Sequence, residues 1–330
     1  MAQLTIVMPA YNAAAFIHDA VGSLLNQTFR DFQLWIADDG STDNTADKIK
    51  AFQDSRIKLF SFPENAGRVR TVNKLVNEIT TPFFTITDAD DISHPKKLEK
   101  QMERMMNDPT LMMCGTSFWA MDEKGYLVRE MKLLTDVDQL RAEALKQSQF
   151  LGPTTMMRKA VIDEFPDFYR TYFIDNFADA DLACRILDKY PATNLREPLY
   201  FYRIVKTSVT RKKVTVRNLN LHRLVGYLSQ QRRHQGHDCL QRNDLKQADR
   251  FMEEIKEEYD RDLSFYPRHQ AFFHLYWGLV DLAFINILNA IRARPFYSKN
   301  YLSFFYIIYR ITFFYLNRGV NKKHYRSLMR

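Results

Sequence analysis

Cysteine and long uncharged apolar runs are both scarce in this sequence of 330 residues. Its three cysteines, Cys114, Cys184 and Cys239, are too few and too scattered for a disulfide framework or a cysteine-based zinc site. No secretory leader precedes the strand-like segment Leu4–Met8. We therefore expect a protein of the reducing cytoplasm.

Acidic residues are missing from the last part of the chain. Residues 201–330 hold 24 Lys and Arg against 10 Asp and Glu, whereas residues 1–200 hold 23 against 29. From Ile291 to the end there are nine basic residues and no acid. This distribution suits a polyanionic partner such as an anionic membrane surface or a nucleic acid. Because no nucleic-acid-binding motif accompanies the basic residues, we expect no nucleic acid.

Two aromatic-rich stretches, residues 271–291 and 301–316, lack the character of a membrane span. Asp281 lies near the centre of the first, where an acid costs about 2.5–3.5 kcal/mol on insertion. The second has 16 residues and contains Arg310, whereas a spanning helix needs about 20. Two interpretations stay open: the stretches pack as a helical region on the core, or they lie at a membrane interface. On the second, the side chains that meet anionic lipid are Arg292, Arg294, Lys299, Arg310, Arg318, Lys322, Lys323, Arg326 and Arg330.

The first hundred residues show a regular alternation of strands and helices. Strands are predicted at residues 4–8, 32–37, 57–62 and 83–87, and helices at 14–27, 44–52, 67–79 and 95–107. This alternation predicts an α/β fold with right-handed crossovers and a mostly parallel sheet covered by helices on both faces. A hairpin around Asp122–Gly125 is expected to extend the sheet. Residues 213–330 are expected to follow residues 1–212 as a basic, aromatic-rich helical appendage.

Three carboxylates, Asp88, Asp90 and Asp91, stand in four residues directly after the predicted strand 83–87. In open α/β sheets, ligands bind at the carboxyl ends of the strands. Clustered carboxylates repel one another unless a cation lies among them, and hard oxygen ligands suit Mg²⁺ or Mn²⁺. The turn therefore predicts a divalent ion that carries a diphosphate. The alternative is a solvated acidic turn before the helix that begins at Pro95.

Polar loops also follow the first two predicted strands, at Pro9–Asn12 and Asp38–Asn44. Loops after parallel strands converge, so both should lie beside the acidic turn. The Asp39 carboxylate can accept a hydrogen bond from the imide N–H of a uracil, and the Tyr11 ring offers a stacking face. Taken alone, Asp38–Asn44 favours a helix N-cap with turn residues, whereas its place beside the other two loops favours a nucleotide site.

Four motifs, in this order, together resemble the family 2 glycosyltransferases, which are inverting enzymes of GT-A fold that use nucleotide-diphosphate sugars. The motifs are Pro9–Asn12, Asp38–Asp43, Asn65–Gly67 with Asn73 six residues later, and Asp88–Asp91. The resemblance divides residues 1–212 into a nucleotide-sugar half, 1–107, and an acceptor half, 108–212. It implies that Asp90, with Asp88 and Asp91, binds Mn²⁺ or Mg²⁺. The implied nucleotide-binding residues are Pro9, Tyr11, Asn12, Asp39, Arg68, Arg70, Asp88 and Asp90.

A second acidic stretch, from Asp175 to Asp181, opens another predicted helix. Acids are common there because they complement the helix dipole. Asp179, Leu182 and Arg185 nevertheless match the spacing of Asp, Leu and Arg in the family. The resemblance implies that Asp179 is the general base that takes the proton of the acceptor hydroxyl, with Asp181 as the alternative.

The chain departs from the family pattern at two positions. A histidine often found two residues after Arg203 is replaced by Val205, which leaves the third metal ligand unassigned. An arginine often found before Asn73 is replaced by Val72, which removes one expected nucleotide contact. The hydroxyl-rich loop that follows Arg203, with Ser208 and Thr210, is expected to fold over a diphosphate.

The resemblance thus implies a metal-dependent, inverting glycosyltransferase of bacterial surface-polysaccharide type. A UDP-sugar is the favoured donor, and a saccharide or lipid-linked saccharide is the expected acceptor. We expect a cytoplasmic protein, peripheral on the inner face of the membrane if the tail binds lipid. Two alternatives stay open. One is a nucleotidyltransferase, although Pro9–Asn12 lacks the Gly-rich basic loop usual in such enzymes; the other is an inactive membrane-surface scaffold that keeps the GT-A fold.

Overall fold

The chain divides into two compact units in a computed structural model that describes residues 2–174, 176–205, 214–318 and 323–329. The first unit comprises residues 1–121 and 129–203 with the last two residues, and the second comprises residues 122–128 and 204–328. The expected boundary at residue 212 falls in the undescribed segment 206–213. The tip of the predicted hairpin belongs to the second unit.

Four parallel strands form the first half of the sheet in the first unit, in the order β3-β2-β1-β4. The register pairs Ala10 with Asp38 and Val7 with Ile86, so the carboxyl ends of β1, β2 and β4 lie at one edge. The predicted strands are confirmed, and so is the convergence of the loops that follow them. The bounds are β1 Leu4–Ala10, β2 Phe32–Asp39, β3 Ile57–Phe62 and β4 Phe83–Ile86.

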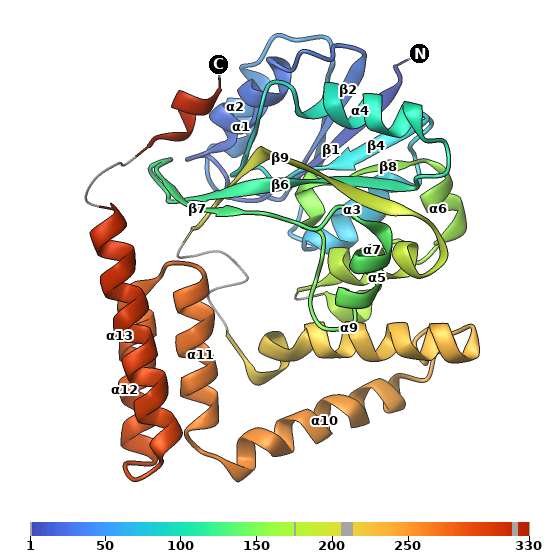
Figure 1. Ribbon diagram of the computed structural model, residues 1–330. Coiled ribbons are helices and arrows are strands. Elements are labelled where there is room, and N and C mark those ends of the chain that lie inside the picture. Colours follow the sequence, from blue (N-terminus) through green and yellow to red (C-terminus); the bar gives the residue numbers. More distant parts are fainter. Residues whose placement is uncertain (1, 175, 206–213, 319–322, 330) are drawn as a thin grey trace. The chain divides into compact units, whose positions relative to one another are not determined.

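Helices cover both faces of this sheet (Figure 1). Alternate residues of β1, Leu4, Ile6 and Met8, point into a core formed with α1, α2 and α4, as the period of two in a strand requires. The opposite face carries α3, α6 and α7 (Figure 1). The bounds are α1 Ile17–Leu25, α2 Thr45–Lys50, α3 Arg68–Val76, α4 Lys97–Asn107, α6 Ala160–Glu164 and α7 Ala178–Lys189.

The second half of the sheet is mixed. Strand β8 runs antiparallel to β4 and β6, β9 runs parallel to β6, and β5 runs antiparallel to β9. The predicted hairpin is confirmed, because β7 pairs with β6. The two-residue strand β5, too short for any periodic signal, carries the acidic turn against β9. The bounds are β5 Ile92–Ser93, β6 Met113–Met121, β7 Leu127–Met131, β8 Met156–Arg158 and β9 Ala192–Arg203, with α5 at Val137–Glu143 and 3-10 turns at Gly152–Thr154 and Thr171–Phe173.

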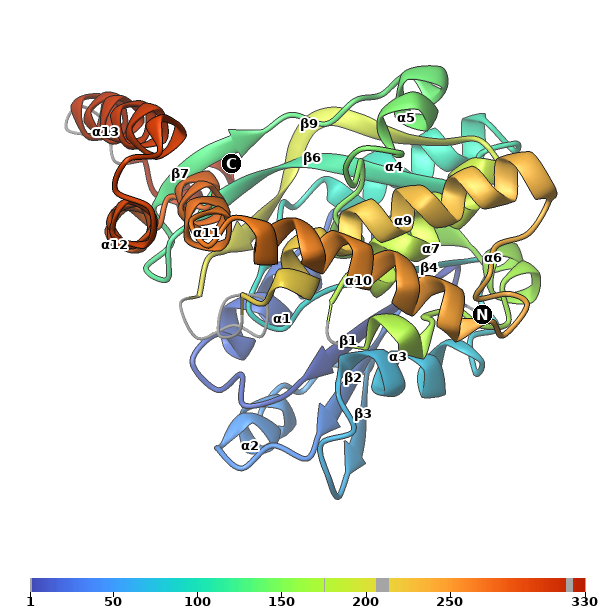
Figure 2. The same cartoon turned by 90° about the horizontal axis from the view of Figure 1, so that it is seen from below.

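The second unit is helical, as predicted. Gly278, with φ of +71°, ends α11 and separates it from α12, so the aromatic stretch 271–291 forms two helices. Helices α11, α12 and α13 lie side by side (Figures 1 and 2) around buried Ala271, Ile287, Ala290 and Ile307. Among the described helices, none is long and apolar enough to cross a membrane. The bounds are α9 Val216–Gln235, α10 Leu245–Arg261, α11 Phe265–Tyr276, α12 Val280–Ala293 and α13 Ser298–Arg318, followed by a 3-10 turn at Tyr325–Leu328.

Candidate active site

The loops after β1 and β2 are tied together by Asn12, which has a φ of +49°. Its Oδ1 accepts from the backbone N–H of Thr42 at 2.8 Å, and its own backbone N–H donates to Ser41 Oγ at 3.0 Å. Pro9 is partly buried at the end of β1, whereas the Tyr11 side chain is 46% exposed. Asn12 therefore shapes the edge of the sheet, and the Tyr11 ring is accessible to a stacking partner.

Asp39 joins the second motif to the third. Its two carboxylate oxygens accept from the backbone N–H groups of Ala66 and Gly67 at 3.0 and 2.9 Å, and the residue is 3% exposed. Gly67 has a φ of +85°, a conformation that favours glycine. Because α3 begins at the next residue, Asp39 fixes the position of Arg68. Each oxygen keeps a second lone pair for a further donor.

The structure separates the two arginines that were expected near the nucleotide. Arg68 Nε donates to Asp88 Oδ1 at 3.1 Å, and its guanidinium lies 5.7 Å from the centre of the Tyr169 ring. Burial disfavours the Arg68 cation, but Asp88, Tyr169 and Asp179 outweigh this and raise its pKa. Arg70 is exposed and lies two residues on, about 200° around the helix. Of the two arginines, only Arg68 contacts the acidic turn.

The three acids of the turn do not share one environment. Asp88 and Asp90 are partly exposed, but Asp91 is 2% exposed and accepts from the Arg203 backbone N–H at 2.6 Å. Arg203 Nε donates to the backbone carbonyl of Asp90 at 2.7 Å. Burial, with Asp90 and Asp88 nearby, raises the pKa of Asp91 well above its usual range. The expectation that Asp91 is a metal ligand does not fit, because its carboxylate is buried against β9.

A buried polar layer that was not predicted lies under the acidic turn. Lys97 is fully buried, its Nζ donates to the Pro153 carbonyl at 3.1 Å, and it lies 5.0 Å from the centre of the Tyr200 ring. The Tyr200 hydroxyl is 3.2 Å from Thr87 Oγ1. Burial lowers the pKa of Lys97 to about 7, against the opposing effect of Asp91 and Asp88. Its sequence signal is weak, since Lys is usually exposed.

The remaining acids suit a divalent ion. Within the described ranges, no three His, Cys, Asp or Glu side chains form a cluster that could hold a metal. Such a cluster is not required here, because Mg²⁺ usually binds through one or two carboxylates together with waters and substrate phosphates. Asp90 and Asp88 are two hard oxygen donors with partly exposed side chains. They fit Mn²⁺ or Mg²⁺ on a diphosphate.

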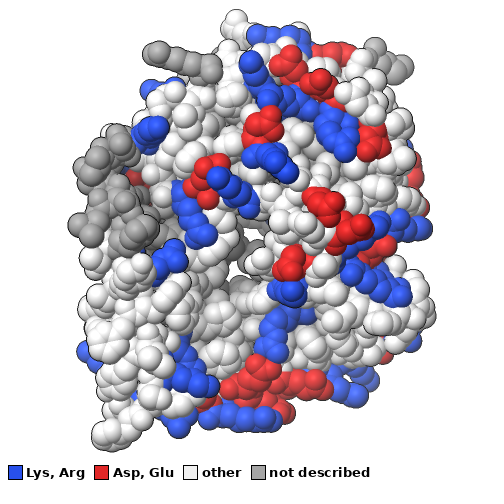
Figure 3. Space-filling model, viewed as in Figure 1, with Lys and Arg blue, Asp and Glu red and all other residues white. Residues whose placement is uncertain are grey.

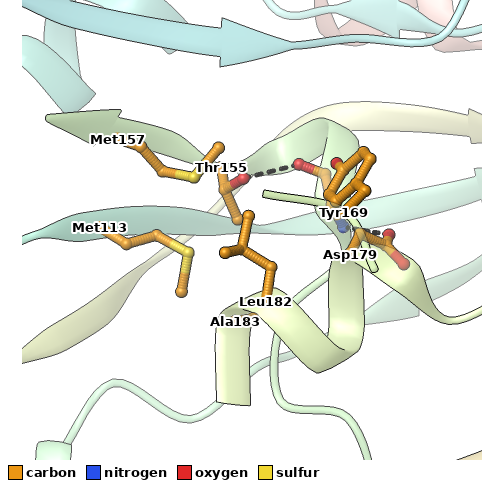
Figure 4. A pocket seen from close by; sticks show the side chains of 8 residues that line it. Met113, Thr155, Met157, Tyr169, Asp179, Leu182 and Ala183 are labelled. Carbon is orange, nitrogen blue, oxygen red and sulfur yellow. Dashed lines mark hydrogen bonds between the residues drawn. The ribbon is translucent and has the colours of Figure 1, made fainter. Parts of the chain in front are cut away.

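Asp179 lies at one end of a small cavity that is lined by Met113, Met157, Tyr169 and Leu182, among others (Figure 4). The cavity holds about 10 Å³, close to the room that one water needs. Asp179 Oδ2 accepts from the Gly152 backbone N–H at 3.1 Å. A Cβ atom on Gly152 would lie 2.2 Å from that oxygen. Gly152 therefore allows the carboxylate its position, and the sequence gives no signal for this beyond a Gly-Pro pair.

Tyr169 connects Asp179 to the acidic turn. Asn73 holds it in place by two hydrogen bonds: Nδ2 donates to the Tyr169 carbonyl at 2.7 Å, and Oδ1 accepts from the Tyr169 N–H at 3.0 Å. Burial raises the pKa of Tyr169, and the charges of Asp179 and Asp88 add to this effect, whereas the Arg68 cation opposes it. Asn73 thus acts on the site through Tyr169, a residue that sequence reasoning missed.

Asp181, the alternative base, is fully buried. Its Oδ2 accepts from Arg170 Nε at 2.9 Å and from Arg185 Nε at 3.0 Å, and Arg170 also pairs with Oδ1. Arg185 further donates to the Phe168 carbonyl at 2.6 Å. These contacts make Asp181 a structural anchor of α7, so of the two acids only Asp179 is partly exposed.

The remaining predicted features are the two positions that depart from the family pattern and the loop that follows Arg203. Val72 is fully buried on the core side of α3, so a side chain at this position points into the core. Val205 is partly buried after β9. Asp175 and the expected phosphate loop with Ser208 and Thr210 lie outside the described residues.

Residues 5–165 match the family model described as Glycosyl transferase family 2. This region of the chain is a family 2 glycosyltransferase domain. Over 216 residues it is 29% identical to the O-antigen biosynthesis glycosyltransferase WbnJ of Escherichia coli, covering 63% of this chain and 82% of WbnJ. Over 112 residues it is 36% identical to the E. coli enzyme UDP-Glc:alpha-D-GlcNAc-diphosphoundecaprenol beta-1,3-glucosyltransferase WfgD, covering 34% of this chain and 44% of WfgD.

Solved structures show that this glycosyltransferase has the GT-A fold. S. aureus TarS in complex with UDP-GlcNAc superposes with a TM-score of 0.56 at 15% identity, covering 92% of this chain and 90% of TarS. Mannosyltransferase PcManGT from Pyrobaculum calidifontis, in complex with GDP-Man and Mn²⁺, superposes with a TM-score of 0.55 at 15% identity, covering 97% of this chain and 88% of PcManGT. The match to a glycosyltransferase family and to named glycosyltransferases favours a sugar-transferring enzyme over the nucleotidyltransferase and inactive-scaffold alternatives.

Proposed function

We propose that this glycosyltransferase moves a sugar from a UDP-sugar to an acceptor hydroxyl with inversion, assisted by Mn²⁺ or Mg²⁺. The observation that carries the proposal is one connected set of contacts. Asp88 binds Arg68, Arg68 lies over Tyr169, and Tyr169 and Asp179 line the same cavity. A donor-side carboxylate and a candidate base therefore lie on opposite ends of one short chain of side chains.

On the donor side, Tyr11 stacks on the base and Asp39 accepts from it. Asp90 is the direct metal ligand, with Asp88 beside it. An ion held by these carboxylates would offset the negative charge that develops on the leaving diphosphate. Arg68 is held charged by Asp88 and Asp179, so it contributes a fixed cation near the phosphates. The donor choice is supported by the UDP-GlcNAc complex of TarS and by the UDP-Glc in the name of WfgD.

On the acceptor side, Asp179 takes the proton from the hydroxyl that attacks the anomeric carbon. The backbone N–H groups of Gly152 and Ala180 donate to its two carboxylate oxygens at 3.1 and 2.9 Å. These hydrogen bonds orient the carboxylate, and the side chain remains partly exposed. Attack by the activated hydroxyl in a single displacement inverts the anomeric configuration. A positioned base of this kind contributes about 10²–10⁴ in rate.

The acceptor is a saccharide, and we favour one that is linked to a lipid, in cell-surface polysaccharide assembly on the cytoplasmic side of the membrane. The names of the two relatives support this choice, because one acts on a diphosphoundecaprenol-linked sugar and the other belongs to O-antigen biosynthesis.

Calorimetric titration of UDP, GDP and dTDP, each with Mn²⁺, Mg²⁺ or EDTA, tests the donor site. We expect UDP to bind in the presence of a divalent ion and to lose most of its affinity in EDTA and in Asp90→Asn. Glu103→Gln is the matched control, because Glu103 is an exposed acid on α4; it should bind like the wild type. Preference for GDP or dTDP would replace the donor assignment, and no binding by folded protein would overturn the proposal.

A further inference from the structure

Helix α13 exposes an apolar face to solvent. Its exposed large side chains are Tyr301, Leu302, Phe305, Tyr306 and Tyr309. At 100° per residue they fall within one arc of about 140°. The opposite side of the helix carries the fully buried Ile307 and Asn300. A helix with apolar residues on both sides normally has a partner on each, and the core of the unit supplies only one.

Neighbouring helices extend this face. The Phe272 ring of α11 lies 5.9 Å from Tyr306, and the Phe284 ring of α12 lies 6.2 Å from Phe304, which contacts Phe305 at 5.7 Å. Phe272 and Phe284 are themselves exposed. We call these exposed residues of α13, with Phe272 and Phe284, the aromatic face. Of the sixteen exposed large hydrophobic residues in the described chain, eleven lie between residues 263 and 309 and seven of these form the aromatic face; an exposed apolar cluster of this kind indicates an interaction surface.

Basic side chains flank the aromatic face. Lys299 and Arg310 fall at one edge of its arc on α13, and an Arg310 nitrogen donates to the Tyr306 hydroxyl at 3.1 Å. Residues 263–330 contain ten Lys and Arg and a single acid, Asp281. Over α12 and α13 the space-filling view is white with scattered blue (Figure 3). The face is therefore apolar with a cationic border.

We propose that the aromatic face is a docking surface for an anionic lipid bilayer, with α13 lying in the plane of the headgroups. Tyrosine suits that depth because it has an apolar ring and a polar tip, and basic residues beside it attract anionic lipid. A second copy of this chain fits less well, because an isologous contact would set this cationic border against itself. The inference rests on the second unit alone and does not depend on the transferase activity.

Co-sedimentation with vesicles tests the proposal. Full-length protein should pellet with vesicles of phosphatidylcholine and 30% phosphatidylglycerol at low salt, and should stay in solution with phosphatidylcholine alone. Leu302→Ser combined with Phe305→Ser should lower the partition coefficient by roughly tenfold or more, because two buried apolar side chains are lost. The matched control combines Met106→Ser with Leu245→Ser, which are exposed apolar residues outside the face and should pellet like the wild type.

A charge pair separates electrostatic attraction from apolar insertion. Lys299→Gln with Arg310→Gln should weaken binding by about fivefold for each cation, whereas Lys96→Gln with Lys246→Gln, both exposed elsewhere, should not. Circular dichroism confirms that each variant is folded. The proposal is overturned if the wild type does not pellet, if the face variants pellet as it does, or if light scattering shows a stable dimer that Leu302→Ser with Phe305→Ser dissociates.

Discussion

The two acidic stretches of the chain are built alike but hold their buried carboxylate differently. In the turn Asp88–Asp91, Asp90 is partly exposed and Asp91 is buried beside Lys97. In the helix start after Asp175, Asp179 is partly exposed and Asp181 is buried between Arg170 and Arg185. In each stretch at least one acid is accessible to ligands, and a buried acid one or two residues further along anchors the backbone that presents it.

The difference lies in the cation. Guanidinium groups stay charged at all working pH values, so the anchor of α7 is a permanent ion pair. Burial lowers the pKa of Lys97 to about 7 and raises that of Asp91, so the anchor of the acidic turn changes its charge near neutral pH. The position of an acid in the sequence does not show whether it is an anchor or an accessible acid. The burial of its carboxylate and the cation beside it show this.

Asp179→Asn removes the accessible acid of the second stretch and should have the largest effect. We expect a loss of about 10²–10⁴ in turnover of the sugar nucleotide, since an amide cannot take the acceptor proton. UDP affinity and the unfolding midpoint should change little. The comparison of initial rates with nucleotide titration checks this, and an active Asp179→Asn would remove Asp179 as the base.

Asp181→Asn removes the anchor instead and should act on stability. The buried guanidinium groups of Arg170 and Arg185 would lose the carboxylate charge that they share, and breaking such a buried pair costs about 3–5 kcal/mol. Urea unfolding measures the loss, with Glu103→Gln as an exposed control expected within about 0.5 kcal/mol. A stable Asp181→Asn with impaired turnover would reverse the roles given to the two acids.

Gly152→Ala displaces the accessible acid without changing its charge. The new Cβ would meet Asp179 Oδ2 at 2.2 Å, so the carboxylate must move, and a displacement of about 1 Å can cost about 10²-fold in rate. Gly22→Ala is the control, because nothing lies within 4 Å of its added Cβ and it sits inside α1; it should stabilise by about 0.5–1 kcal/mol. Equal turnover in the two variants would contradict the placement of Asp179.

Lys97→Met sharpens the contrast between the two anchors. The pKa of Lys97 is about 7 in the folded protein and about 10.4 in the unfolded chain. Between these values the unfolded state binds the extra proton, so the contribution of Lys97 to stability rises with pH, by about 1.4 kcal/mol per unit at most.

The free energy of unfolding of the wild type should therefore rise between pH 8 and pH 9 through the contribution of Lys97. In Lys97→Met this rise should be smaller by about 1 kcal/mol. Lys96→Met, a change at the exposed neighbouring lysine, should keep the wild-type difference. The same pH dependence in all three proteins would show that Lys97 is not poised to titrate.

The sequence predicted the parallel half of the first unit well. Strand and helix periodicity placed β1 to β4 and their helices, and the rule for parallel strands brought Asn12, Asp39 and Asp88 to one edge. These features depend on local pattern and on a topological rule, so one sequence suffices for them.

The anchors and their partners could not be predicted in the same way. Asp91 is fixed by Arg203 and lies near Lys97, Asp181 by Arg170, and Asp179 by Gly152. Most of these partners lie many residues apart along the chain and meet only because β8 and β9 add to the sheet in a mixed order. No local periodicity encodes that order, and so Asp91 was expected among the metal ligands.

We propose that Asp90 and Asp179 serve a single metal-dependent, inverting transfer. A proton NMR time course of sugar-nucleotide turnover tests it most directly, with UDP-sugars as donors in Mg²⁺ or in EDTA. We expect metal-dependent release of UDP, with the sugar appearing first as the anomer of inverted configuration. Retained configuration, or equal release in EDTA, would contradict it.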